Sequence, residues 1–209
     1  MIVSAELRWF WKDALPPDVE RWFRSGDHPP GGGTPRVDEY LVDRRQTELG
    51  VKKRGTNDGV ELKGLLALGR QAPRPFGGRV QIWAKWISEA LAIDHLPRVS
   101  ITKTRWLRNY DTSGERLTEV QLDSSERPVV PGSRPLVRGC QFELVAIAIN
   151  EHKATWWSVG FEAFGELNTI EDSLDRTLVQ VAPLAPNLSD GLGISYPEWL
   201  ARFGVEGTA

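Results

Sequence analysis

Charged side chains two residues apart recur in short runs of strand-forming residues. Four such pairs are Glu6 and Arg8, Lys52 and Arg54, Glu61 and Lys63, and Lys103 and Arg105. Side chains alternate between the two faces of a β-strand, so each pair points to one side of a sheet. Apolar residues occupy the opposite side of the first run, at Leu7, Trp9 and Trp11. The chain must therefore bury one face of its sheet and turn the other toward water or a polar ligand.

Alternating runs of this kind predict most of the secondary structure. We expect strands at 3–11, 36–43, 49–54, 59–66, 79–86, 98–111, 116–122, 140–150 and 154–165. Turn-forming residues at 55–59, 111–114 and 151–153 predict three hairpins. Breaker-rich segments predict loops at 26–35, 67–78 and 124–139. Short helices are expected at 18–25 and 197–203, and a longer one at 169–181, with Thr169 and Asp172 as a capping box.

These elements predict a mainly β protein of the α+β class. Hairpin-linked strands with few helices favour an eight-stranded antiparallel, tunnel-like β-barrel with the helices packed outside. We expect a single domain over 1–209, with the C-terminal helix and tail at about 169–209. The alternative is a β-sandwich whose charged face is solvated, since any half-buried antiparallel sheet alternates.

Composition limits the location and the partners of the protein. The 209-residue chain is 40% apolar and 26% charged, which is typical of a folded globular protein. Its formal charge of −2 argues against nucleic acid as a partner. Cys140 is the only cysteine, which favours a reducing cytoplasm. The apolar start lacks the pattern of a signal peptide, and no apolar run approaches the ~20 residues of a membrane helix, so we predict a cytoplasmic protein without membrane contact.

Two glutamates lie within apolar runs of the predicted strands. Glu143 and Glu162 would each be buried there, and a buried carboxylate needs a cation or a ligand. A structural salt bridge and a ligand site both satisfy that need. The sequence leaves these two alternatives open.

The order of several motifs resembles the CYTH, or triphosphate tunnel metalloenzyme, superfamily. The motifs are an early Glu6 strand, Asp38-Glu39-Tyr40, Lys52-Lys53-Arg54, Glu61-Leu62-Lys63-Gly64, Lys103-Thr104-Arg105 and Ser195-Tyr196-Pro197-Glu198-Trp199-Leu200. Members of that superfamily form an eight-stranded tunnel in which basic residues bind a triphosphate or polyphosphate. Glutamates of the tunnel bind Mg²⁺ or Mn²⁺ for phosphohydrolysis or ATP cyclisation.

The resemblance implies a role for each matching residue. It makes Lys52, Arg54, Lys63, Lys103 and Arg105 phosphate contacts, and Arg8 and Lys85 are further candidate phosphate contacts. It makes Glu6, Glu61, Glu143 and Glu162 the catalytic carboxylates, with Glu61, Glu143 and Glu162 as ligands of Mg²⁺ or Mn²⁺. The implied partner is a small phosphorylated anion such as triphosphate, a nucleoside triphosphate or polyphosphate, and a homodimer stays open.

The first strand departs from the superfamily pattern. Where that pattern reads Glu-x-Glu-x-Lys, this chain has Arg8 and Phe10 at the second and third positions. A guanidinium group cannot ligate a metal, but it can bind a phosphate through two hydrogen bonds. The chain is therefore either a metal-dependent phosphohydrolase or a non-catalytic domain that lost the metal site. A non-catalytic domain would bind nucleotide or polyphosphate, or dock a protein partner on its apolar exterior.

Overall fold

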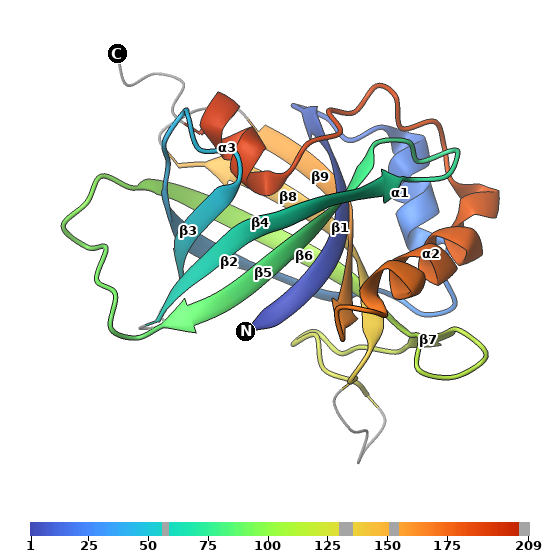
Figure 1. The fold of residues 1–209 in the computed structure, drawn as a ribbon. Helices are drawn as coiled ribbons and strands as arrows, with labels where there is room; N and C mark the ends of the chain where they lie inside the picture. Colours follow the sequence, from blue (N-terminus) through green and yellow to red (C-terminus); the bar gives the residue numbers. More distant parts are fainter. Residues whose placement is uncertain (56–58, 130–135, 151–154, 205–209) are drawn as a thin grey trace.

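Antiparallel strand pairing organises the chain, whose computed structural model describes residues 1–55, 59–129, 136–150 and 155–204 (Figure 1). The strands are β1 (Ile2–Lys12), β2 (Gly31–Leu41), β3 (Leu49–Arg54), β4 (Val60–Gln71), β5 (Arg79–Ser88), β6 (Val99–Asp111), β7 (Thr118–Val120), β8 (Gly139–Ile149) and β9 (Thr155–Gly165). The helices are α1 (Pro17–Arg24), α2 (Ile170–Val181) and α3 (Tyr196–Phe203), and a 3₁₀ turn, η1, spans Ala182–Leu184.

Eight of the strands close into a barrel. Their order around the sheet is β2-β3-β4-β5-β1-β9-β8-β6, and β2 also pairs with β6, which completes the ring. Every pairing is antiparallel, and β7 is an extra strand on β6. The predicted eight-stranded antiparallel barrel is therefore confirmed, and the sandwich alternative is wrong. No helix in the described ranges is both long and apolar enough to span a membrane.

Helices α1 and α2 cover one outer side of the barrel (Figure 1). The outward side chains of β1, Leu7, Trp9 and Trp11, share a buried apolar cluster with residues of both helices and of β8 and β9. Trp22 of α1 lies against Phe142 of β8, with 4.7 Å between their ring centroids. Burial of these large apolar surfaces drives the packing, as the alternation in β1 predicted.

Helix α3 fills one end of the barrel. The Ser195 hydroxyl accepts a hydrogen bond from the Glu198 amide at 3.1 Å and caps the helix. Trp199 is fully buried and stacks on Phe10 of β1 at 5.2 Å between ring centroids. These rings belong to a second apolar cluster with β2, β6, β8 and β9. The lumen-facing side of the sheet is therefore apolar at this end, where it packs against α3.

Two segments predicted as loops belong partly to strands. Strand β2 begins at Gly31, and its register with β6 shifts between Gly32 and Pro35, so the glycines form a bulge. A Cβ at Gly31 would lie 2.6 Å from the carbonyl oxygen of Asp123, which explains why glycine is needed there. Strand β4 similarly continues to Gln71 through two register shifts against β5. Bulges accommodate, within the strands, the glycine and proline residues that suggested loops.

Other local predictions had mixed outcomes. Helix α2 begins one residue after Thr169, but the predicted capping box is wrong, because the Thr169 hydroxyl donates to the carbonyl oxygen of Glu166 at 3.0 Å. The Asp172 carboxylate pairs with Arg138 instead. The second predicted hairpin is confirmed by the pairing of β6 with β7. The predicted turns at 55–59 and 151–153 fall wholly or partly outside the described residues.

Candidate functional site

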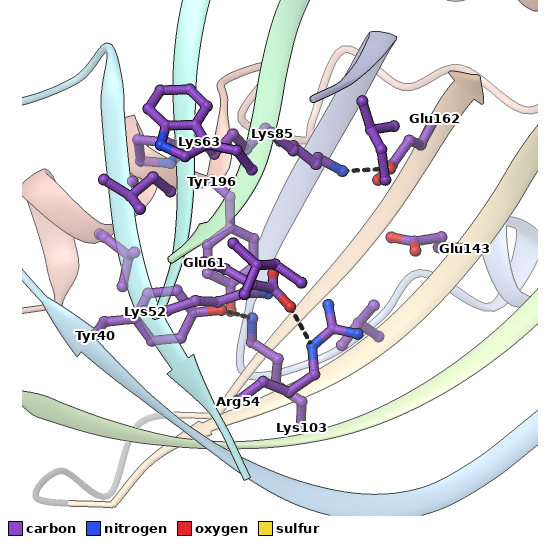
Figure 2. A pocket seen from close by; sticks show the side chains of 18 of the residues that line it. Tyr40, Lys52, Arg54, Glu61, Lys63, Lys85, Lys103, Glu143, Glu162 and Tyr196 are labelled. Atoms are coloured by element: carbon purple, nitrogen blue, oxygen red, sulfur yellow. Dashed lines mark hydrogen bonds and ion pairs between the residues drawn. The ribbon is translucent and has the colours of Figure 1, made fainter. Parts of the chain in front are cut away.

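A cavity of about 510 Å³ lies inside the barrel. Figure 2 shows charged side chains from different strands pointing into it. The charged and tyrosine side chains that line it are Arg8, Arg36, Tyr40, Lys52, Arg54, Glu61, Lys63, Lys85, Lys103, Arg105, Glu143, Glu162 and Tyr196. Apolar side chains of Met1, Ile2 and Ile87 also contribute to the lining, and all three are exposed to solvent.

The predicted site residues converge in this cavity. All of them except Glu6 line it, and Glu6 lies behind Lys63, whose ammonium group donates to Glu6 Oε2 at 2.5 Å. The period-two pattern thus located the lumen-facing positions correctly. The phosphate-binding, catalytic and metal-binding roles of these residues stay predictions.

Glu6 and Glu162 neutralise two lysines on neighbouring strands. The Lys85 ammonium group lies 3.5 Å from Glu6 Oε1 and also donates to Glu162. Burial would raise the pKa of Glu6, but Lys63 and Lys85 outweigh burial and lower that pKa to about 2. Burial would lower the pKa of Lys85, yet Glu162 and Glu6 raise it. Glu6 and Lys85 are thus held ionised by their partners.

Glu143 bridges two arginines. Arg8 Nη2 donates to Glu143 Oε2 at 2.6 Å, and Arg105 Nη1 donates to Oε1 at 2.9 Å. Burial would raise the pKa of Glu143, but Arg8 and Arg105 lower it. A Cβ at Gly160 would lie 2.8 Å from Arg8 Cζ, so the absence of a side chain there leaves room for the guanidinium group. Both arginines are thus fixed by a shared carboxylate.

Arg105 has a second carboxylate partner that the sequence did not indicate. Its Nε donates to Glu126 Oε1 at 2.9 Å. Glu126 follows β7 in a segment predicted as loop, without any alternation that would have predicted a lumen contact. Its backbone φ is +62°, in the left-handed region.

The Asp38 carboxylate forms ion pairs with three cations. Its carboxylate is fully buried, and it lies 3.3 Å from Arg36 Nε, 3.6 Å from Lys103 Nζ and 3.9 Å from Lys52 Nζ. Asp38 does not itself line the cavity, whereas its three partners do. The cations therefore stand between Asp38 and the lumen. Arg36 and Asp38 were not predicted as site residues, although alternation along β2 puts both on the lumen face.

Glu61 is the other carboxylate on this side. Its Oε2 lies 3.1 Å from Lys52 Nζ, and its Oε1 lies 3.0 Å from Arg54 Nε. Burial lowers the pKa of Lys52 to about 8, and Arg54 adds to that effect while Glu61 and Asp38 oppose it. Burial and Lys52 likewise lower the pKa of Lys103 far below its ordinary value. Asp38 and Glu61 therefore do not neutralise all of the cations with which they pair on this side of the cavity.

Two tyrosines complete this part of the cavity. The Lys103 ammonium group lies 3.7 Å from the ring centroid of Tyr196 and 4.6 Å from that of Tyr40, and it donates to the Tyr40 hydroxyl. The Tyr196 hydroxyl is buried without a hydrogen-bond partner among the described residues. Neither tyrosine was predicted as a site residue. Tyr40 had the correct parity on β2, but Tyr196 comes from α3, where strand alternation gives no signal.

The carboxylates predicted to bind a divalent metal are each paired with a cation. Glu61 pairs with Lys52 and Arg54, Glu143 with Arg8 and Arg105, and Glu162 with Lys85. Each carboxylate thus already has a cation beside one or both of its oxygens, and Mg²⁺ or Mn²⁺ would compete with that cation for them. Within the described part of the chain, no cluster of three or more His, Cys, Asp or Glu residues has the arrangement of a metal site. Salt bridges satisfy the buried carboxylate of Glu143 and the partly exposed carboxylate of Glu162.

Comparison with known proteins does not identify the chain. It matches no protein-family model and no curated protein sequence. The resemblance to the CYTH superfamily therefore stays a prediction from the order of the motifs. Function has to be inferred from the charged cavity.

Proposed function

We propose that the barrel lumen binds a small phosphorylated anion, such as triphosphate, a nucleotide or polyphosphate. One observation carries this proposal: the described lining of the cavity contains eight cationic side chains and three carboxylates. Three further carboxylates, Glu6, Asp38 and Glu126, contact these cations from outside the lining and leave an excess of two positive charges. A chain with an overall charge of −2 has thus concentrated positive charge in its interior.

Phosphate is the anion that suits this lining best. Arginine donates two parallel hydrogen bonds to phosphate oxygens, and lysine supplies a compact charge. Both kinds of side chain face the lumen from several strands, so a ligand would be surrounded rather than touched on one side. Inside a cavity each such interaction is stronger than on an open surface because the effective dielectric constant is lower.

Binding without hydrolysis is the activity that the site supports. A general base works best when its pKa lies near the working pH. Ion pairing outweighs burial and lowers the pKa of Glu6, Glu61 and Glu143, so these carboxylates are weak proton acceptors. Cations also lie beside both oxygens of Glu61 and of Glu143, where a metal ion would compete with them. The non-catalytic alternative therefore has more support than a phosphohydrolase.

Ligand-induced stabilisation tests the proposal. Melting temperature would be measured with inorganic phosphate, tripolyphosphate, ATP and long polyphosphate, each against sodium chloride of equal ionic strength. A ligand at about 100 times its dissociation constant stabilises a protein by roughly 2.7 kcal/mol, and we expect such a rise with the phosphate compounds. No rise with any of them would contradict the proposal and favour a protein-interaction domain.

A turnover assay separates binding from catalysis. The same phosphate compounds would be incubated with the protein and Mg²⁺ or Mn²⁺, and released phosphate would be measured. We expect no release above the protein-free control. Metal-dependent release that Glu143→Gln abolishes would instead establish the phosphohydrolase alternative.

A further inference from the structure

The cations of the lumen form two groups with different carboxylate partners. The electropositive half comprises Arg36, Lys52, Arg54 and Lys103 with Asp38 and Glu61. The balanced half comprises Arg8, Lys63, Lys85 and Arg105 with Glu6, Glu126, Glu143 and Glu162. Figure 2 shows Lys85 and Glu162 apart from the group formed by Lys52, Arg54 and Glu61.

The excess positive charge belongs entirely to one group. In the electropositive half four cations share two carboxylates, and one of these, Asp38, is fully buried behind its partners. In the balanced half four cations meet four carboxylates. Among the described residues the balanced half is therefore electrically neutral, whereas the electropositive half carries two uncompensated charges when Lys52 and Lys103 are protonated.

A hydrogen-bond donor without a partner also faces the electropositive half. Tyr196 lines the cavity, its hydroxyl group is buried, and no hydrogen-bond partner for it lies in the described residues. Its ring contacts the ammonium group of Lys103 at 3.7 Å from the centroid. A buried hydroxyl without a partner is unfavourable, and an anion bound beside Lys103 would accept its hydrogen bond.

We propose that a single phosphoryl dianion binds in the electropositive half, while the balanced half contributes a neutral wall and binds no phosphate. The inference rests on the proposed function and specifies it further. A phosphate monoester carries about −1.5 to −2 charges at neutral pH, which matches the two uncompensated charges. The ligand class is then a phosphomonoester or one terminal phosphoryl group, rather than a triphosphate held along the whole lumen.

Crowding among the cations supports this placement. The charged and titratable groups facing Lys52 and Lys103 are Arg36, Asp38 and Tyr40 from β2, Arg54 from β3, Glu61 from β4, Arg8 from β1 and Tyr196 from α3. Burial and the neighbouring cations lower the pKa of Lys52 to about 8, and they lower that of Lys103 well below its ordinary value. A bound dianion would reverse the effect, so phosphate binding near pH 8 should take up protons.

Calorimetric titration of the full chain with inorganic phosphate, diphosphate and tripolyphosphate tests the placement. We expect inorganic phosphate to bind, and tripolyphosphate to bind less than about tenfold more tightly. Titrations near pH 8 in buffers of different ionisation enthalpy should show proton uptake. Tripolyphosphate binding more than about a hundredfold tighter than phosphate would overturn the inference while leaving the proposed function intact.

Matched variants locate the phosphate within the lumen. Lys52→Met and Lys103→Met should each weaken phosphate binding by at least about tenfold. Lys53→Met is the control, because Lys53 is the neighbour of Lys52 on β3 but pairs with Asp94 and does not line the cavity. The double variant Glu6→Gln/Lys63→Met removes one ion pair from the balanced half without changing its net charge, and it should alter affinity less than about threefold.

The outcomes separate the two proposals. A double variant that weakens phosphate binding as much as Lys103→Met would place phosphate in both halves and overturn the inference alone. Absence of phosphate and tripolyphosphate binding in the unsubstituted protein would overturn the proposed function as well. Tyr196→Phe gives a second measurement, since it removes only a hydroxyl group and should weaken phosphate binding without lowering the melting temperature.

Discussion

At the scale of single residues, Lys103 shows a conflict between stability and the proposed binding. Its ammonium group is buried beside Lys52, and burial together with that neighbour lowers its pKa. We expect Lys103→Met to raise the free energy of unfolding at neutral pH by on the order of 1 kcal/mol while it weakens phosphate binding. Urea denaturation without phosphate measures the first effect, and a less stable variant would contradict the account of Lys103 as a strained cation.

A site residue could be predicted from the sequence only when it belongs to a regular strand. Residues of regular strands, such as Lys52 and Glu162, were found because alternation fixes the face that each occupies. Arg36 and Tyr40 obeyed the same rule on β2 and were overlooked. Glu126 and Tyr196 come from a turn and a helix, whose orientation toward the lumen depends on tertiary packing. No local pattern could have assigned these two to the site.

At the scale of elements, a buried ion pair fixes the segment before β2. Arg108 of β6 donates from Nη1 and Nη2 to the carbonyl oxygen of His28, both at 2.7 Å, and lies 3.3 Å from Glu119 of β7. Glu119 in turn accepts a hydrogen bond from the Asp27 amide at 2.9 Å. These contacts hold residues 27–28 against the outside of the barrel.

Removing one member of that ion pair should destabilise the folded protein. Arg108→Met leaves the buried Glu119 carboxylate without its cation, so we expect the free energy of unfolding to fall by about 3 to 5 kcal/mol. Chemical denaturation measures the loss. The double variant Arg108→Met/Glu119→Leu should recover part of it, and equal stability of the single variant and the unsubstituted protein would refute this role.

Element boundaries were harder to predict than element types. The amphipathic stretch at 169–181 and the alternating runs gave α2 and the strands correctly. Glycines at the start of β2 and in β4 were interpreted as loop residues, because a single sequence does not distinguish a bulge inside a sheet from a break between strands. Only pairing with the neighbouring strand distinguishes a bulge from a break.

At the scale of the whole molecule, the ion pairs of the lumen make the free energy of unfolding depend on pH. The folded-state pKa of Glu6 is about 2, against an ordinary value of 4.5, so the unfolded chain binds more protons between these values. The contribution of Glu6 to the free energy of unfolding is then fully present above pH 4.5. It falls by about 3 kcal/mol as the pH drops to 2. Denaturation across this range measures the loss, and Glu6→Gln should show a shallower dependence; identical slopes would contradict the assignment.

Helix α3 has a consequence for long ligands. Because Trp199 and its apolar neighbours fill one end of the described barrel, we expect no passage from one mouth to the other. A polymer could insert only a terminus and could not thread through. If polyphosphate binds, the number of protein molecules per strand should follow its number of free ends and stay constant as the polymer lengthens.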